Sequence, residues 1–246
     1  MKKVVLFKNA SEEYEKAFVD SNFEVIFVEP LQFTYVNTEK LQEKLEQSYD
    51  GLILTSPRSV EAVAKCWDPS KFVVWNTRKT YTVGDASRQK IYSLLGLEAL
   101  GATSGNAEKL AEIIVNENSK HTKFLFPCGN LRSETLPDML QEAEIAIDAV
   151  TVYETTENKN LEKELRRLNE LEHELCSVVF FSPSGCEYVY RQLQVQINKI
   201  SNIPHFAIGH TTAHKIQSFG VGVAGVAAKP NAESVVESVQ KYLASL

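Results

Sequence analysis

The sequence predicts an α/β protein built from a duplicated unit, in which each copy is a parallel sheet flanked by helices. Short apolar runs alternate with amphipathic stretches along the chain, a pattern typical of parallel sheets that are covered on both faces. Ordered blocks of similar sequence also recur at a period of about 120 residues, which indicates a duplication. The 246 residues are enough for two modest domains.

Three ordered pairs of segments carry the repeat. The matching pairs are 51–63 with 177–189, 81–96 with 206–220, and 104–114 with 229–239. Asn9 and Asn130, each shortly after an apolar strand, form a further pair. Both members of the first pair contain a short apolar run, then Ser-Pro, then an amphipathic stretch. We interpret each as a buried strand whose Ser caps the following helix, with Pro at the first helical position.

The remaining elements follow the same alternation. Besides the two Ser-Pro segments, the expected strands are 3–7, 23–28, 81–83, 97–100, 123–126, 145–153, 205–208 and 221–226. The expected helices are 11–20, 38–48, 86–95, 106–117, 133–143, 157–175, 211–219 and 231–243. Five leucines at helical spacing in 157–175 indicate one apolar stripe against a sheet. The stretch 31–38 is less regular and is interpreted as a connector.

Charge and cysteine content narrow the class of protein. The formal net charge of -6 argues against a general nucleic-acid binder, which usually carries a basic face. The four cysteines show no spacing typical of zinc or redox sites, so we expect reduced, buried thiols. The N-terminal apolar run VVLF is too short for a signal peptide, and no segment has the roughly 20 apolar residues needed to cross a bilayer. The cytoplasm is therefore the expected compartment, with no membrane partner.

Polar turns after the strands are the best candidates for a ligand site. They lie at the carboxyl ends of strands, where α/β proteins bind ligands and helix starts can hold anions. The residues are Ser56, Gly84, Asn106, Ser182, Ser184, Gly209, Thr211 and Thr212. Plain helix capping is the alternative at each turn, and the number of such turns favours anion binding. Glycine fingerprints for nucleotides are absent, no serine has a visible His-Asp partner, and His210 with His214 lacks a third metal ligand.

The two halves differ at three further positions. Tyr153 falls opposite Gln32, so this tyrosine near the connector has no twin. Lys8 and Arg58 are cations beside duplicated strand-end turns. Packing of the tyrosine and solvation of the two cations are the alternatives to a functional role.

The chain resembles the uroporphyrinogen-III synthase family of the animal type. The resemblance rests on the ordered segments TSPRSVEAV, SGNAEKLAE, LFPCGNLR, AVTVYET, FFSPSG and AIGHTTA, and it spans about residues 3–243. It implies two flavodoxin-like lobes joined by a two-stranded β connector. The implied boundaries are 1–34 with 158–246 for lobe one, 39–149 for lobe two, and 31–38 with 149–157 for the connector. The repeat alone suggests a simple cut near residue 120.

The implied activity is that of a lyase of haem biosynthesis. The resemblance implies cyclisation of hydroxymethylbilane to uroporphyrinogen III with loss of water and inversion of ring D, in a monomer that holds its substrate in the cleft between the lobes. Tyr153 matches the family's tyrosine, for which a general-acid role is proposed. Ser56, Ser182, Thr211, Thr212 and Asn106 would hold substrate carboxylates with Lys8 and Arg58 nearby, and no cofactor or metal is implied. The alternatives are a non-catalytic bilobed protein that binds a small polyanion and a nucleotide-dependent enzyme.

Overall fold

The chain forms two compact units. The structure, a computed structural model, describes residues 1–195 and 200–245. Unit 1 comprises Met1–Gln32 and Thr156–Leu246, and unit 2 comprises Phe33–Thr155. The chain passes from one unit to the other twice, in the strands β3 (Leu31–Tyr35) and β7 (Ala146–Glu157), which are neighbours in one sheet. These two strands form the β connector between the units.

Unit 1 is a five-stranded sheet in the order β10-β9-β8-β1-β2, and its paired strands are parallel. Its strands are β1 (Lys2–Phe7), β2 (Phe23–Phe27), β8 (Leu175–Phe180), β9 (His205–Ala207) and β10 (Gly225–Val226). Its helices are α1 (Glu12–Val19), α7 (Leu161–Glu170), α8 (Pro183–Val195), α9 (His210–Gln217) and α10 (Ala232–Leu243). Read along the chain this is the order 2-1-3-4-5, the flavodoxin-like arrangement.

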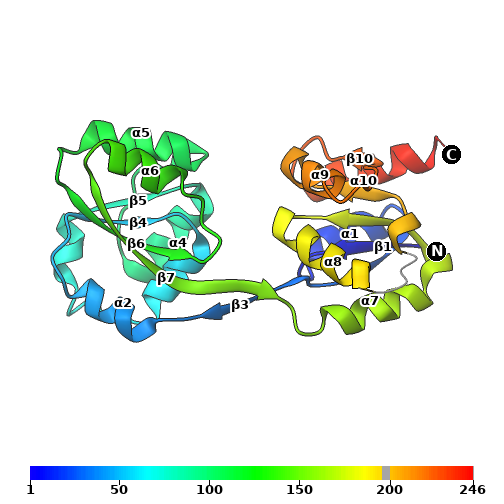
Figure 1. The fold of residues 1–246 in the computed structure, drawn as a ribbon, viewed down its shortest axis with the longest axis horizontal. Coiled ribbons are helices and arrows are strands. Elements are labelled where there is room, and N and C mark those ends of the chain that lie inside the picture. Colours follow the sequence, from blue (N-terminus) through cyan, green and yellow to red (C-terminus); the bar gives the residue numbers. More distant parts are fainter. Residues whose placement is uncertain (196–199, 246) are drawn as a thin grey trace. The chain divides into compact units, whose positions relative to one another are not determined.

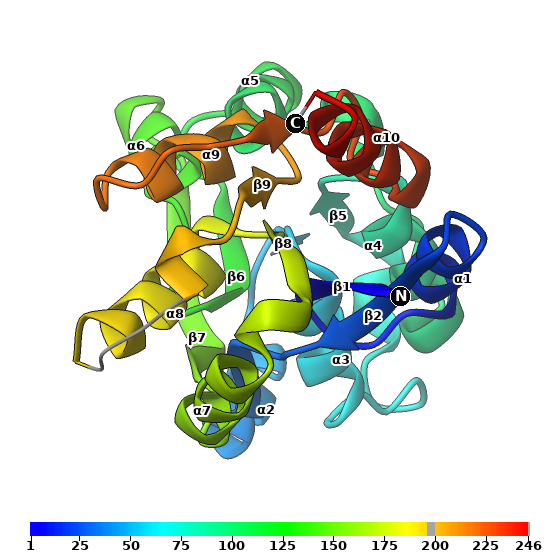
Figure 2. The ribbon, with the colours of Figure 1, turned by 90° about the vertical axis from the view of Figure 1, so that its right-hand side faces the viewer.

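Alternation along the central strand β1 sends side chains to both faces of this sheet. Val4 and Leu6 pack in the cluster that contains the buried residues of α1 and α10. Val5 and Phe7 pack in the opposite cluster, with residues of α7, α8 and α9. Figure 2 shows these two helical layers on either side of the strands of unit 1. A strand that is buried on both faces has to be apolar at successive positions, as VVLF is.

Unit 2 contains the sheet β3-β7-β6-β4-β5. Its further strands are β4 (Gly51–Leu54), β5 (Lys79–Thr82) and β6 (Lys123–Gly129). Its helices are α2 (Thr38–Leu45), α3 (Pro57–Ala64), α4 (Asp85–Leu95), α5 (Ala107–Glu117) and α6 (Thr135–Glu142). Buried residues of α2, α3 and α4 form one cluster and those of α5 and α6 form the other, and Figure 1 shows the helices around the strands of this unit.

The two units share one topology. The parallel pairs β4·β5, β4·β6 and β6·β7 repeat the pairs β8·β9, β1·β8 and β1·β2. The strands made equivalent by the sequence repeat are therefore also equivalent in the sheets. The predicted fold class of two similar parallel α/β units is confirmed.

One predicted strand, 97–100, does not form, and another, 221–226, is shorter than expected. The segment 97–100 contributes only a single bridge, between Tyr81 and Leu100, and 221–226 forms a strand only at Gly225–Val226. Each lies at the outer edge of its sheet, where one neighbour at most can pair with it. Gly96 and Gly101, with φ of 70° and 77°, also bend the chain on both sides of the first segment.

The predicted helix 157–175 is wrong at both ends. Strand β7 continues to Glu157, and the Asn158 N–H then donates to the Pro30 carbonyl at 3.0 Å. The helix is limited to Leu161–Glu170, and Leu175 already begins β8. The leucine stripe therefore combines a helical face with the start of a buried strand, because both contribute to the same cluster.

Candidate functional site

The predicted polar turns of unit 2 begin helices at the carboxyl edge of its sheet. Ser56 follows β4 and caps α3, where its Oγ accepts from the Ser59 N–H at 3.1 Å. Gly84 follows β5 and precedes α4, with φ of 80°. Asn106 caps α5, and its side chain accepts from the Lys109 N–H at 2.9 Å. Ser56 and Asn106 cap their helices with a short polar side chain, whereas Gly84 makes no side-chain cap, and each cap leaves further N–H groups of the first helical turn without an intrahelical partner.

Tyr153 lies beside the first of these turns. Its Oη is 3.1 Å from Ser56 Oγ. Its ring packs against the backbone of Gly129, the residue paired with it across β6 and β7. A Cβ atom at position 129 would lie 2.5 Å from the tyrosine Cζ, so only glycine fits without moving the ring.

Asn130 fixes the strand that carries this tyrosine. The Thr155 N–H donates to Asn130 Oδ1 at 2.8 Å, and Asn130 Nδ2 donates back to the Thr155 carbonyl at 3.3 Å. The Asn130 N–H also donates to the Tyr153 carbonyl at 3.2 Å. Sequence reasoning noticed Asn130 as a repeat partner but missed its role and that of Gly129. The available signal was the Gly-Asn pair directly after an apolar strand.

A pocket of about 160 Å³ opens next to Tyr153. Its lining includes Gly129, Thr55, Cys128 and Arg132. Sequence reasoning missed Arg132, although this arginine ends the segment LFPCGNLR that carries part of the family resemblance. The pocket therefore brings a phenol and a guanidinium to the same edge of the sheet.

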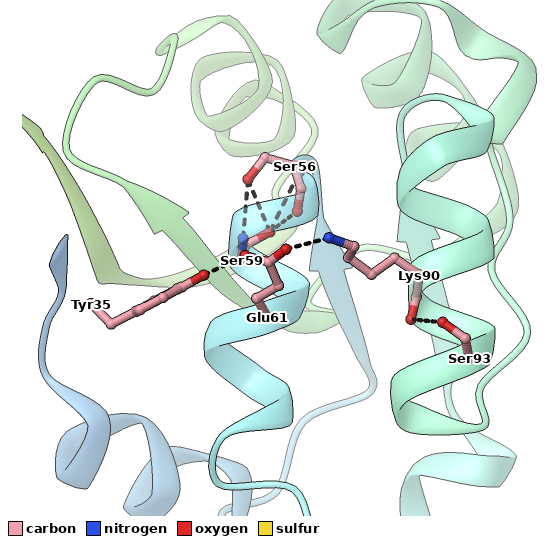
Figure 3. A network of polar contacts seen from close by, with 6 residues as sticks. All are labelled: Tyr35, Ser56, Ser59, Glu61, Lys90 and Ser93. Atoms are coloured by element: carbon pink, nitrogen blue, oxygen red, sulfur yellow. Dashed lines mark hydrogen bonds and ion pairs between the residues drawn. The ribbon is translucent and has the colours of Figure 1, made fainter. Parts of the chain in front are cut away.

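A second polar network anchors the connector strand β3 to unit 2. Tyr35 Oη donates to Glu61 Oε2, and Lys90 Nζ donates to Glu61 Oε1 (Figure 3). The hydrogen bonds from Lys90 and Tyr35 lower the pKa of Glu61, while burial and Glu61 raise the pKa of Tyr35 to about 12. Nearby, the Arg58 guanidinium lies 3.4 Å from the ring centre of Phe33. Arg58 is thus held by an aromatic ring on β3 and is not a freely solvated cation.

The predicted site residues of unit 1 also lie after its strands. Ser182 Oγ accepts from the Gly185 N–H at 3.0 Å at the start of α8, and Ser184 lies half-buried in the same turn. Gly209 precedes α9 with an extended φ of -175°, so its backbone does not require glycine. Of the two threonines that follow, Thr211 is exposed and Thr212 is 3% exposed. Only Thr211 therefore presents its hydroxyl to solvent.

Lys8 is the cation of the unit 1 edge. Its Nζ lies 3.6 Å from the ring centre of Tyr14 and 4.9 Å from that of Phe181. Burial lowers the pKa of Lys8. The ammonium is held between two aromatic rings, as is typical of a cation–π site.

The described part of the chain has neither a metal cluster nor a membrane helix. No group of three or more His, Cys, Asp or Glu side chains in residues 1–195 and 200–245 is arranged to hold a metal ion, and His210 and His214 are both exposed on α9. In the same residues no helix has the length and apolarity needed to span a bilayer. All four cysteines are free, and Cys128 and Cys186 are buried.

The fold is that of a duplicated α/β protein with polar helix-start turns at the carboxyl edges of its sheets. A family model described as Uroporphyrinogen-III synthase HemD matches residues 12–237, so the chain belongs to the uroporphyrinogen-III synthase family. A uroporphyrinogen-III synthase of Saccharomyces cerevisiae is 26% identical over an alignment of 265 positions, which covers 98% of this chain and 96% of the yeast protein.

Solved structures support the same fold. A mutant uroporphyrinogen III synthase of Thermus thermophilus matches with a TM-score of 0.66 at 14% identity, with 100% of both chains covered. The enzyme of Helicobacter pylori 26695 matches with a TM-score of 0.65 at 15% identity and covers 100% of this chain and 99% of its own. The family expected from the sequence is confirmed, and the alternative of a non-catalytic binding protein is not favoured. The protein is an enzyme of tetrapyrrole biosynthesis that cyclises hydroxymethylbilane.

Proposed function

We propose that this protein cyclises hydroxymethylbilane to uroporphyrinogen III with Tyr153 as the general acid. The observation that carries the proposal is the contact between Tyr153 Oη and Ser56 Oγ at 3.1 Å, beside a pocket at the carboxyl edge of the unit 2 sheet. A phenol in this position has a proton to give and a neighbour that can stabilise the charge left behind.

The chemistry requires departure of the terminal hydroxyl group. The C–O bond of the hydroxymethyl carbon breaks, the oxygen leaves as water with the proton from Tyr153, and an azafulvene cation remains. The substituted carbon of ring D attacks this cation to give a spiro-pyrrolenine. The bond from that carbon to its original methylene bridge then breaks, the methylene recloses on the unsubstituted α-carbon of ring D, and the proton lost from that carbon restores the Tyr153 phenol, which leaves ring D inverted. The linear substrate also closes unaided to the symmetric isomer, so the enzyme mainly has to hold one conformation and assist the departure of hydroxide.

Ser56 suits the role of supporting the tyrosine. Its Oγ accepts from the Ser59 N–H, and its own proton has two acceptors within reach, Ser59 Oγ at 3.3 Å and Tyr153 Oη at 3.1 Å, so it can turn to the tyrosine oxygen as negative charge develops there. Ser56 also stands at the start of α3, where the helix dipole is positive and favours a developing negative charge. Both effects stabilise the tyrosinate that forms as the proton leaves.

Substrate binding is assigned to the turns at the sheet edges. Hydroxymethylbilane carries eight carboxylates, whereas the protein has a formal net charge of -6, so binding has to be local. N–H groups at helix starts bind carboxylates without formal charge, and hydroxyl and amide groups add short hydrogen bonds. The proposed contacts are Lys8, Ser56, Arg58, Gly84, Asn106, Ser182, Ser184, Gly209, Thr211 and, through its N–H, Thr212.

An isomer assay tests the function, and one substitution tests the acid. Hydroxymethylbilane incubated with the protein should give mainly the type III isomer, whereas a product ratio equal to that of the spontaneous reaction refutes the activity. Tyr153→Phe should slow formation of the type III isomer by about 10²- to 10⁴-fold, the usual contribution of a general acid. Tyr92→Phe is the matched control, because Tyr92 is 63% exposed on α4. An unchanged rate for folded Tyr153→Phe assigns the tyrosine to packing.

We further propose that the enzyme works as a monomer in the cytoplasm, without nucleic acid or membrane partners. The four free cysteines support a reducing compartment. Light scattering at micromolar concentration should give a mass near 27.6 kDa. A dimer mass that persists on dilution contradicts the monomer.

A further inference from the structure

The pocket beside Tyr153 contains an arginine that is only partly paired. The Arg132 N–H donates to the Gly129 carbonyl at 3.3 Å, which holds the residue at the end of β6. Its Nη2 lies about 3.3 Å from the exposed carboxylate of Glu134, and its Nη1 lies 3.7 Å from Cys128 Sγ. The buried Nε has no hydrogen-bond partner among the residues that the structure describes.

Apart from the exposed Glu134, the Arg132 guanidinium has no carboxylate partner among the described residues. Cys128 is 2% exposed, and burial raises the pKa of its thiol, so the sulfur is neutral. The lining contains neither Asp nor Glu. A buried donor without a partner is costly, and a guanidinium offers paired donors that match a carboxylate. The pocket is therefore complementary to a carboxylate that the protein itself does not supply.

The pocket has room for a small polar group with a short apolar stem. At about 30 Å³ for each water in the liquid, 160 Å³ corresponds to about five waters. This is room enough for the few heavy atoms of an acetate or propionate side arm. The apolar lining from Leu131, Leu136 and Phe126 suits the methylene groups of such an arm.

The pocket is also a departure from the duplicated scaffold. By the Ser-Pro pairing, Thr55 is equivalent to Phe181, and by the strand-end pairing Gly129 is equivalent to Lys8. In unit 1 these two larger side chains contact each other, with the Lys8 ammonium 4.9 Å from the Phe181 ring centre. In unit 2 the smaller Thr55 and Gly129 line the pocket instead. Departures from a shared scaffold are expected at functional sites.

We infer that this pocket is a carboxylate subsite, in which Arg132 binds one acetate or propionate arm of the substrate and fixes the pyrrole that bears it beside Tyr153. The inference rests on the proposed function for the identity of the ligand. It deepens that function, because it assigns one of the eight carboxylates to a named cation. Arg132 is thus a substrate-positioning residue, and it does not transfer the proton.

The test compares Arg132→Gln and Arg132→Lys with Arg166→Gln, which removes an arginine that is 66% exposed and pairs with Glu162 on α7. Arg132→Gln should raise KM for hydroxymethylbilane by about 10- to 100-fold, the effect of losing a charge-assisted hydrogen bond. Arg132→Lys should recover part of this loss, and Arg166→Gln should match the unsubstituted chain. The fraction of type III isomer should fall with Arg132→Gln, because one pyrrole is no longer held.

A second readout does not depend on turnover. Propionate, at constant ionic strength set by sodium chloride, should raise the melting temperature of the unsubstituted chain and of Arg166→Gln but not of Arg132→Gln. Propionamide, which has the same shape without the charge, should have no effect on any of them. A folded Arg132→Gln that keeps its KM and its response to propionate within twofold overturns the inference. If the unsubstituted chain forms no excess of type III isomer, the proposed function fails, while the propionate experiment still reports on the pocket.

Discussion

The contact between Gly129 and Tyr153 provides a test of how strictly the tyrosine has to be positioned. In Gly129→Ala the added methyl carbon would lie 2.5 Å from the tyrosine Cζ and 2.7 Å from its Oη. Ordinary contacts begin near 3.4 Å, so the ring has to retreat by about 0.9 Å. The clash is at the hydroxyl end of the ring, so the movement displaces the Oη atom that makes the 3.1 Å contact with Ser56 Oγ.

Gly129→Ala is expected to have different consequences for stability and for catalysis. Overpacking by one methyl group destabilises by about 1–3 kcal/mol, which an ordinary domain survives. A displacement of about 1 Å at a reacting group costs about 100-fold in rate, equivalent to about 2.7 kcal/mol in the activation free energy. Gly129→Ala should therefore remain folded and lose about 100-fold in kcat for type III formation.

The double variant Gly129→Ala/Tyr153→Phe separates a positional effect from a general one. If the alanine acts only by moving the phenol, the double variant should be no slower than Tyr153→Phe alone, because the effects of coupled residues do not add. Gly222→Ala is the matched control, since a Cβ there meets nothing within 4 Å. A folded Gly129→Ala with full kcat, or a double variant whose losses are additive, refutes the reasoning. Urea unfolding measures the change in stability, and single-turnover kinetics measure the rate of type III formation.

Two further results follow from the structure. Ser56→Ala and Ser182→Ala each remove a helix cap and should each lower the free energy of unfolding by about 1 kcal/mol in urea titrations. Ser56→Ala should also lower kcat, because Ser56 contacts Tyr153, whereas Ser182→Ala removes a proposed substrate contact and should act mainly on KM. An unchanged kcat in Ser56→Ala contradicts the support assigned to Ser56. Burial lowers the pKa of His205 to about 4, whereas its value in the unfolded chain is about 6.5. Unfolding between these values therefore takes up a proton. The free energy of unfolding should fall by about 2 kcal/mol as the pH drops from 7.5 to 5. His205→Phe should remove this part of the acid sensitivity. If urea titrations of His205→Phe show the same loss of unfolding free energy between pH 7.5 and pH 5 as the unsubstituted chain, His205 is not its cause.

The fold was predictable from the sequence because two copies of one repeat carry the same pattern of strands and helices. Each apolar run has a twin at the equivalent strand, and the strand order of unit 2 repeats that of unit 1. The failures at 97–100 and 221–226 concern segments whose structure depends on the sheet edge. The run at 97–100 has the composition of a strand, yet only Leu100 meets a neighbouring strand there. Hydrophobic pattern alone does not report how many partners an edge provides.

The candidate site was predictable only in part. Tyr153 was found because it lacks a twin in the repeat, and the helix caps were found because Ser-Pro and Asn-Ala-Glu are local signals. Gly129 and Arg132 were missed because their roles depend on the register of β6 against β7, which has an irregularity between Cys128 and Gly129. The Tyr35–Glu61 contact joins residues 26 positions apart, and no local pattern announces such a pair.

The energetics of isomer selection explain how a site with so few specialised groups can suffice. The linear substrate closes without help, so the enzyme has to favour one closure over another and need not overcome a very high barrier. A product ratio of 99 to 1 requires only about 2.7 kcal/mol between the two transition states. One charge-assisted hydrogen bond contributes about 1.5–3 kcal/mol, so a single contact such as that of Arg132 can decide most of the ratio. The ratio of isomers should therefore respond to loss of a positioning contact at least as sharply as the total rate of substrate consumption, which includes the spontaneous reaction.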